Sequence, residues 1–166
     1  MKHLFRTSIL IVILFLSLFT FVNAQKVPSV SIGGEVSTPL SLTKQDILSM
    51  PQTTYTSKDR DGKEHQYKGV IVAALLEKAG VTLGPKLRGE NLTKYLVVEA
   101  ADGYEVIYSL PELDPEFSNQ VPILAIEKDG QEIPNGEGPF RIIAPNDKRP
   151  ARWIREVRQI KVLFSK

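Results

Sequence analysis

The stretch ILAIEKDGQEIPNGEGPFRIIAP, residues 123–145, carries two apolar runs joined by glycine-containing turns. The first run leads into Asp129-Gly130, a dipeptide that favours a turn with positive φ and therefore a hairpin. We expect residues 122–127 to pair with the segment that follows this turn. After a Gly-Pro dipeptide, residues 140–144 have the β-branched and aromatic content of another strand. The stretch therefore predicts short strands connected by turns.

The rest of the chain combines further strand patterns with two helix patterns. Thr43, followed three residues later by Asp46, resembles a capping box and predicts a short helix ended by Pro51. A buried helix is expected to open at Gly69 and to end at Gly80 in the C′ position. Strand patterns occur at residues 30–36 around a Gly-Gly bend, at 53–57 and 64–67 as an exposed hairpin, at 95–100 and 104–109 around an Asp-Gly turn, and at 157–164. About seven strands and two helices predict an α+β fold in one domain, residues 25–166, rather than a βαβ alternation.

The first residues have the order of a secretory signal peptide. Lys2, His3 and Arg6 precede the apolar run 9–22, and small residues follow up to Ala24. A run of this length is short for a bilayer, which needs roughly twenty residues, so we expect cleavage near Ala24 rather than a stable membrane span. The sequence predicts an exported protein of the periplasm or the extracellular space.

Charge is balanced overall but unevenly placed. Removing residues 1–24 takes Lys2 and Arg6 from the 21 basic residues and nothing from the 19 acidic ones, which leaves 19 of each. A neutral chain gives no reason to expect nucleic acid, whose binding needs excess Lys and Arg. Residues 101–140 are acidic and residues 141–166 are basic. This asymmetry allows a local anion site, and the alternative is that the two segments neutralise each other.

The chain has no cysteine, and His65 is its only histidine after residue 24. These absences exclude from this chain thiolate catalysis, cysteine-containing zinc sites, iron–sulfur clusters, bis-histidine haem and histidine-dependent catalytic triads. His65 lies among polar residues at a strand end, where we expect exposure to solvent rather than a ligand role.

Five stretches together, in order from about Gly33 to Val162, resemble one family. They are GGEVSTPLSLTKQDILSMP (33–51), YKGVIVAALLEKAGV (67–81), VEAADGYEVIYSLPEL (98–113), the opening stretch, and ARWIREVRQIKV (151–162). Their order is similar to that of the sulfite-oxidase-fold, molybdopterin-binding oxidoreductase domain family. The resemblance implies a mixed, β-rich sulfite-oxidase-like fold with short helices, and molybdopterin as cofactor.

The resemblance also implies a metal ligand that this chain lacks. Enzymes of the family hold molybdenum through a pyranopterin dithiolene and one cysteine thiolate, which lies roughly a dozen residues before the Gly-aliphatic helix. Counting back from Gly69 leads to Thr56 or Ser57. A serine hydroxyl loses its proton far less readily than a thiol, so we expect Ser57 to be an ordinary strand residue and assign no metal ligand.

Basic residues in and after the strand 140–144, which follows the Gly-Pro dipeptide, match the region where the family places anion-binding groups. The resemblance implies that Arg141, Arg149 and Arg152 hold the pterin phosphate or ring edges, with a point charge from Lys148 and a phenol from Tyr104. Each has an alternative. Arg141 suits the solvated face of a strand, and Arg152 suits a surface turn paired with acids from residues 101–140. Asp102-Gly103-Tyr104 is first a turn, and Trp153 suits a core or rim anchor.

Three functions fit these observations. One is a molybdopterin-dependent oxidoreductase, against which the missing cysteine argues. Another is a non-catalytic module of the cell envelope that binds a pterin, another small anionic ligand or an envelope protein partner. The weakest is a structural envelope protein that pairs through its charge asymmetry.

Overall fold

The stretch 123–145 forms three strands of one sheet in the computed structural model, which describes residues 27–165. β7 (Ile123–Lys128) pairs antiparallel with β8 (Gln131–Glu132) and with β9 (Arg141–Ile143). Asp129 and Gly130, between β7 and β8, have φ of 53° and 74°. The expected pairing across this turn and the expected strand after the Gly-Pro dipeptide are confirmed.

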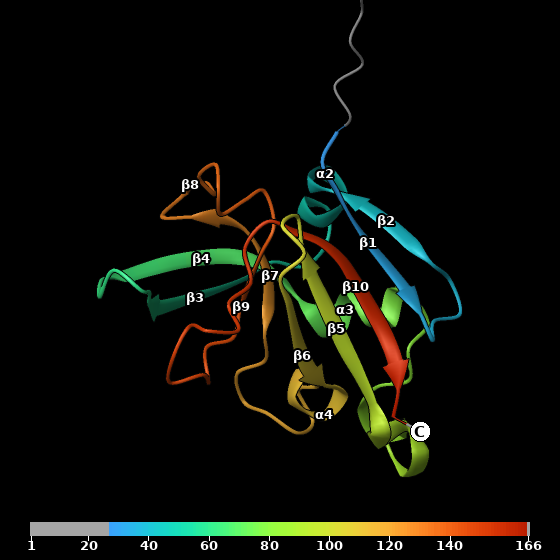
Figure 1. The fold of residues 1–166 in the computed structure, drawn as a ribbon. Helices are drawn as coiled ribbons and strands as arrows, with labels where there is room; N and C mark the ends of the chain where they lie inside the picture. The colour runs from blue at the N-terminus through green and yellow to red at the C-terminus, as the bar shows by residue number, and fades with distance from the viewer. Residues whose placement is uncertain (1–26, 166) are drawn as a thin grey trace, which may run out of the picture.

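The same sheet has the strand order β3-β4-β7-β8, with β9 added beside β7 (Figure 1). β3 (Thr53–Lys58) and β4 (Glu64–Ile71) form the predicted hairpin, in a register that places Ser57 opposite His65. The hairpin extends to the left of the molecule in Figure 1. Because β4 also pairs with β7 through residues 67–71, the hairpin belongs to the same sheet as residues 123–145.

The start of the buried helix differs from the prediction. Gly69 and Ile71 belong to β4, and α3 (Val72–Lys78) begins only after them. A Cβ on Gly69 would lie 2.1 Å from the carbonyl oxygen of Leu124 in β7. The glycine is therefore needed for the close approach of two strands, a role that its position before an apolar run does not reveal. The predicted C′ role of Gly80 is confirmed by its φ of 80°.

The second sheet has the order β2-β1-β10-β5-β6 (Figure 1). Its strands are β1 (Ser29–Gly34), β2 (Leu40–Thr43), β5 (Lys94–Ala100), β6 (Glu105–Ser109) and β10 (Val157–Phe164). β1 and β10 run parallel, and the other neighbours are antiparallel. The predicted strand pair around Asp102-Gly103 is confirmed as β5 and β6. β2 was not predicted, and no strand continues beyond Gly34 into residues 35 and 36.

Short helices connect the strands. α2 (Lys44–Leu48) has the predicted capping box between Thr43 and Asp46 and ends before Pro51. α4 (Leu110–Leu113) and the 3₁₀ helices η1 (Gly84–Lys86) and η2 (Gly89–Thr93) were not predicted. Residues 27–165 thus contain ten strands and three short α-helices. The predicted β-rich α+β class is confirmed, with more and shorter elements than expected.

The core is formed by Val, Ile and Leu side chains from both sheets and α3. Four large aromatic side chains are buried with them: Tyr67, Tyr108, Phe140 and Trp153. The predicted signal peptide lies outside the described residues. Within residues 27–165, no helix has the length and hydropathy needed to cross a membrane.

Candidate functional site

Residues 144–156, between β9 and β10, separate two surface hollows. Backbone hydrogen bonds from Ile142 to Ile154 and from Val157 to Phe140, both 2.9 Å, fix this segment against β9. Trp153 holds it from inside: the side chain is 2% exposed, and its indole N–H donates to the Ala144 carbonyl at 2.9 Å. The interpretation of Trp153 as a core anchor is confirmed.

Arg141 is fully buried on β9, so its interpretation as the solvated face of a strand is wrong. Its neighbours Phe140 and Ile142 are buried as well, because β9 has no solvent-facing side. The guanidinium donates to both carboxylate oxygens of Asp59, each at 2.9 Å, and to Glu137 at 2.7 Å. A buried guanidinium needs such partners, since an unpaired charge in the interior is very costly.

Asp59 links this ion pair to the β3–β4 turn. Burial opposes its ionisation, but hydrogen bonds from Arg141 and Tyr67 hold the pKa of Asp59 well below its ordinary value. Burial raises the pKa of the Tyr67 phenol, which donates to the same carboxylate. Asp59 does not stand out in the sequence, because a carboxylate two residues before Asp61-Gly62 looks like part of a solvated turn.

The Tyr104 hollow lies on one side of residues 144–156. We define it by Arg60, Asp102, Tyr104, Trp153, Arg155 and Glu156, and its volume is about 410 Å³. The Tyr104 ring is 52% exposed, and its hydroxyl is 3.4 Å from the Ala151 carbonyl. Arg60 donates to the Pro150 carbonyl at 3.3 Å. The β3–β4 turn, the β5–β6 turn and the segment before β10 thus meet at one place.

Three exposed cations in the segments that meet here have no carboxylate partner among the described residues, and one of them, Arg60, lines the hollow. The ion pairs of the adjoining segment use Arg152 and Arg155, and within residues 27–165 none uses Arg60, Lys148 or Arg149. Arg155 pairs with Glu137 at 3.5 Å. Lys148 and Arg149 directly precede Pro150, to which Arg60 is bonded. Arg60 was missed from the sequence because nothing local connects its turn to residues 148–150.

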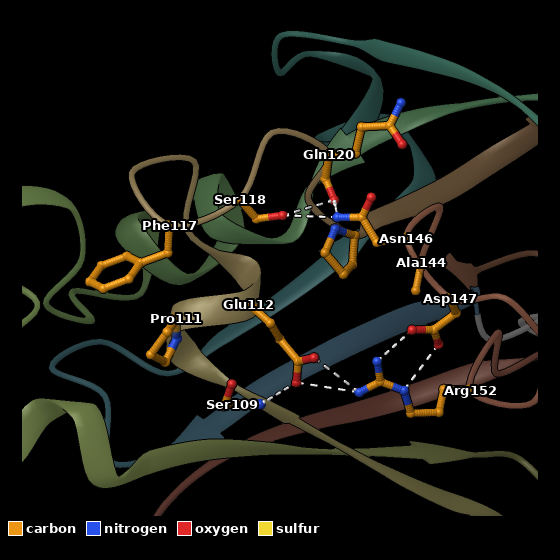
Figure 2. Close-up of a pocket in the computed structure, with 11 residues that line it drawn as sticks. Ser109, Pro111, Glu112, Phe117, Ser118, Gln120, Ala144, Asn146, Asp147 and Arg152 are labelled. Carbon is orange, nitrogen blue, oxygen red and sulfur yellow. Dashed lines mark hydrogen bonds and ion pairs between the residues drawn. The ribbon is translucent and has the colours of Figure 1, made fainter.

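Arg152 faces the other side, in a hollow of about 400 Å³ that we call the Phe117 hollow. Ser109, Pro111, Glu112, Phe117, Ser118, Gln120, Pro122, Ala144, Asn146, Asp147 and Arg152 line it. Arg152 pairs with Asp147 at 2.6 Å and with Glu112 at 3.2 Å (Figure 2). The hydrogen bond to Asp147 is the main reason why the pKa of Arg152 is raised. The expected pairing of this arginine with an acid from residues 101–140 is confirmed by Glu112.

The five predicted binding residues are therefore not brought together. Tyr104 lines the Tyr104 hollow, Arg152 lines the Phe117 hollow, and Arg141 lies in the interior. Lys148 and Arg149 are exposed and line neither hollow. Ligand binding by these residues stays a prediction.

Ser57 and His65 face each other across the β3–β4 ladder. His65 is only 16% exposed, so the expectation of a solvent-exposed histidine is wrong. Its Nδ1 lies 2.6 Å from Asp129 and its Nε2 lies 3.0 Å from Asp61, and these two hydrogen bonds raise the pKa of His65. Each ring nitrogen thus has its own carboxylate partner.

The sequence matches the oxidoreductase molybdopterin binding domain family over residues 23–165. The chain belongs to this family. A similar solved structure is that of the sulfane dehydrogenase SoxCD from Paracoccus pantotrophus, with 21% sequence identity and a TM-score of 0.64. The alignment covers 81% of this chain and 38% of the sulfane dehydrogenase chain, so this domain spans less than half of that chain's length. A search of curated proteins found no match.

The residues present do not fit a molybdenum atom held by a protein thiolate. The chain has no cysteine, and residues 27–165 contain no group of three His, Cys, Asp or Glu side chains placed to hold a metal. Asp59, two residues after Ser57, already has its carboxylate bonded to Arg141 and Tyr67. The exposed Arg60 of the Tyr104 hollow remains suited to an anionic group.

Proposed function

We propose that this domain is a binding module for a small anionic molecule, such as a phosphate-bearing pterin, and that it does not carry out the family's molybdenum redox chemistry. The Tyr104 hollow is the binding site. The observation that carries the proposal is that Arg60 lines this hollow without a carboxylate partner within residues 27–165. Arg60 also donates to Pro150, which directly follows the exposed Lys148 and Arg149 in the chain.

The chemistry of the hollow supports a ligand with a charged and an aromatic part. A guanidinium can donate two parallel hydrogen bonds to a phosphate or carboxylate. Arg60 and Arg149 each carry a guanidinium that can bind in this way. The exposed ring of Tyr104 gives a flat apolar surface beside them. Asp102 and Glu156 also line the hollow, so an anion must bind at the side of the arginines.

The anion site is tested by titrating the full chain with pyrophosphate at low ionic strength in a calorimeter. We expect the combined substitution of Arg60→Gln and Arg149→Gln to weaken binding by at least about tenfold, because each charged hydrogen bond contributes roughly 1.5–3 kcal/mol. The combined substitution of Lys86→Gln and Arg88→Gln removes two exposed positive charges at the end of η1 and just after it, and is the matched control.

Two results would contradict the proposed site. One is an absence of pyrophosphate binding by the unsubstituted chain. The other is equal weakening by the Lys86→Gln and Arg88→Gln control, which would mean that pyrophosphate responds to overall charge. In that case the envelope-protein partner is the remaining alternative.

The location of the protein is part of the proposal. The charged, apolar and small-residue order of residues 1–24 supports export and cleavage near Ala24. Recovery of the chain from the periplasm or the medium, with a mature N-terminus at Gln25 by mass spectrometry, is the expected result. Recovery of uncleaved chain in the cytoplasm would overturn it.

A further inference from the structure

The Phe117 hollow is a second surface site with an unusual balance of charge. Three charged side chains line it: Glu112, Asp147 and Arg152. Figure 2 shows the two carboxylates on either side of the guanidinium, which gives the three groups a net charge of about −1 when all are ionised. The three charged side chains of the hollow thus carry a net negative charge although one of them is an arginine.

Arg152 has little left to offer an anion. Its Nε and one terminal nitrogen donate to Asp147 at 3.0 and 2.6 Å. The other terminal nitrogen is shared between Glu112, at 3.2 Å, and the Ile107 carbonyl, also at 3.2 Å. The guanidinium also lies over the Tyr108 ring, 4.6 Å from its centroid. Because its donors are used by the protein, the charge that the hollow presents to a ligand is carboxylate.

The neutral polar groups of the hollow also favour a ligand that donates hydrogen bonds. The Asn146 amide nitrogen donates to the Ser118 hydroxyl at 2.9 Å and to the Gln120 carbonyl at 2.8 Å (Figure 2). The Ser109 backbone N–H donates to Glu112 at 2.5 Å. What these groups leave available is mainly acceptors: the Asn146 side-chain oxygen and the remaining lone pairs of the carboxylates.

Apolar side chains complete the wall. The Phe117 ring is 52% exposed, and Pro111, Pro122 and Ala144 lie around the same hollow. Exposed apolar surface favours a ligand with a hydrocarbon body, and an aromatic face favours a cation over an anion. A volume of about 400 Å³ accommodates a small organic molecule.

We infer that the Phe117 hollow binds a small organic cation, an ammonium group on a hydrocarbon stem. The ammonium lies against Glu112, Asp147 and the Asn146 oxygen, and the stem lies on Phe117. This site is separate from the Tyr104 hollow, shares no lining residue with it, and does not depend on the anion-binding proposal.

Three probes of similar stem length test the inference: n-hexylammonium, n-hexanol and hexanoate, each titrated into the isotopically labelled full chain and followed by amide chemical shifts. Hexylammonium is expected to bind most tightly and hexanoate least, with the largest shifts at Ser109, Ser118 and Asn146. We expect Glu112→Gln and Phe117→Ala each to weaken hexylammonium binding by roughly threefold to fivefold.

The variants are chosen to keep the fold. Glutamine at residue 112 still completes a capping box with Ser109, so Glu112→Gln removes charge without removing the cap. Leu92→Ala removes an exposed apolar side chain of η2 and is the control for Phe117→Ala. The inference is overturned if no probe binds, if hexanol or hexanoate binds as tightly as hexylammonium, or if both variants bind like the control. Loss in the control equal to that of Phe117→Ala also overturns it.

Discussion

Asp59 and Arg141 lie 82 residues apart in the chain and form the most buried ion pair of the described residues. A buried pair is often no more stable than two apolar side chains, but removing one partner leaves a buried charge without compensation. We therefore expect Asp59→Ala to lower the free energy of unfolding by about 3–5 kcal/mol, measured by urea denaturation at pH 7.

The control for this prediction is Glu99→Ala, which breaks the half-exposed pair with Lys161 in the second sheet. Exposed pairs contribute up to about 1 kcal/mol, so this variant is expected to unfold almost like the unsubstituted chain. Because the pKa of Asp59 is depressed, its contribution is present above the unfolded pKa of about 4 and is lost as the pH falls further. Equal stability of the two variants at pH 7 would contradict a buried-charge role for Asp59.

At the scale of the elements, β4 and β7 approach each other closely at Gly69. Replacing Gly69 by alanine places a methyl group 2.1 Å from the Leu124 carbonyl oxygen, so the two strands must separate. We expect Gly69→Ala to destabilise the folded state by about 1–3 kcal/mol or more. The measurement is the fall in melting temperature, followed by circular dichroism. Gly33→Ala in β1 is the matched control, because a Cβ there has no atom within 4 Å. A loss no larger than that of the control would contradict the close-approach role.

Elements that depend on neighbouring residues could be predicted from the sequence. The Thr43–Asp46 capping box, the Gly80 cap and the hairpins at Asp61-Gly62 and Asp102-Gly103 each follow from a few adjacent side chains. The start of α3 could not be predicted, because Gly69 is required for close contact with β7, a strand more than fifty residues away in the sequence. The burial of Arg141 could not be predicted either, since the alternation of residue types along β9 does not reveal that both faces of the strand are covered. For the same reason, the placement of Arg152 and Tyr104 in different hollows was not visible in the sequence.

At the scale of the whole molecule, the domain has the fold of its family. It lacks the cysteine thiolate that binds the metal in enzymes of that family. The ordered core and both sheets are formed by residues that need no cofactor, because the interior between them is filled by apolar side chains and the Asp59–Arg141 pair. We therefore expect folding and metal binding to be separable in this chain.

This separation predicts the metal content of the protein. The full chain is to be purified from a host that makes molybdenum cofactor. We expect it to contain far less than one molybdenum atom per chain by plasma mass spectrometry. We also expect it to release far less than one fluorescent oxidised pterin per chain. A cysteine-containing member of the family, expressed and purified in the same way, is the control that the host loads such domains. Because the soft thiolate is the protein's only direct bond to the metal in the family, its absence leaves contacts to the pterin alone, and we expect the intact cofactor to be lost during purification. Stoichiometric molybdenum in the unsubstituted chain would contradict this and return the redox hypothesis to first place.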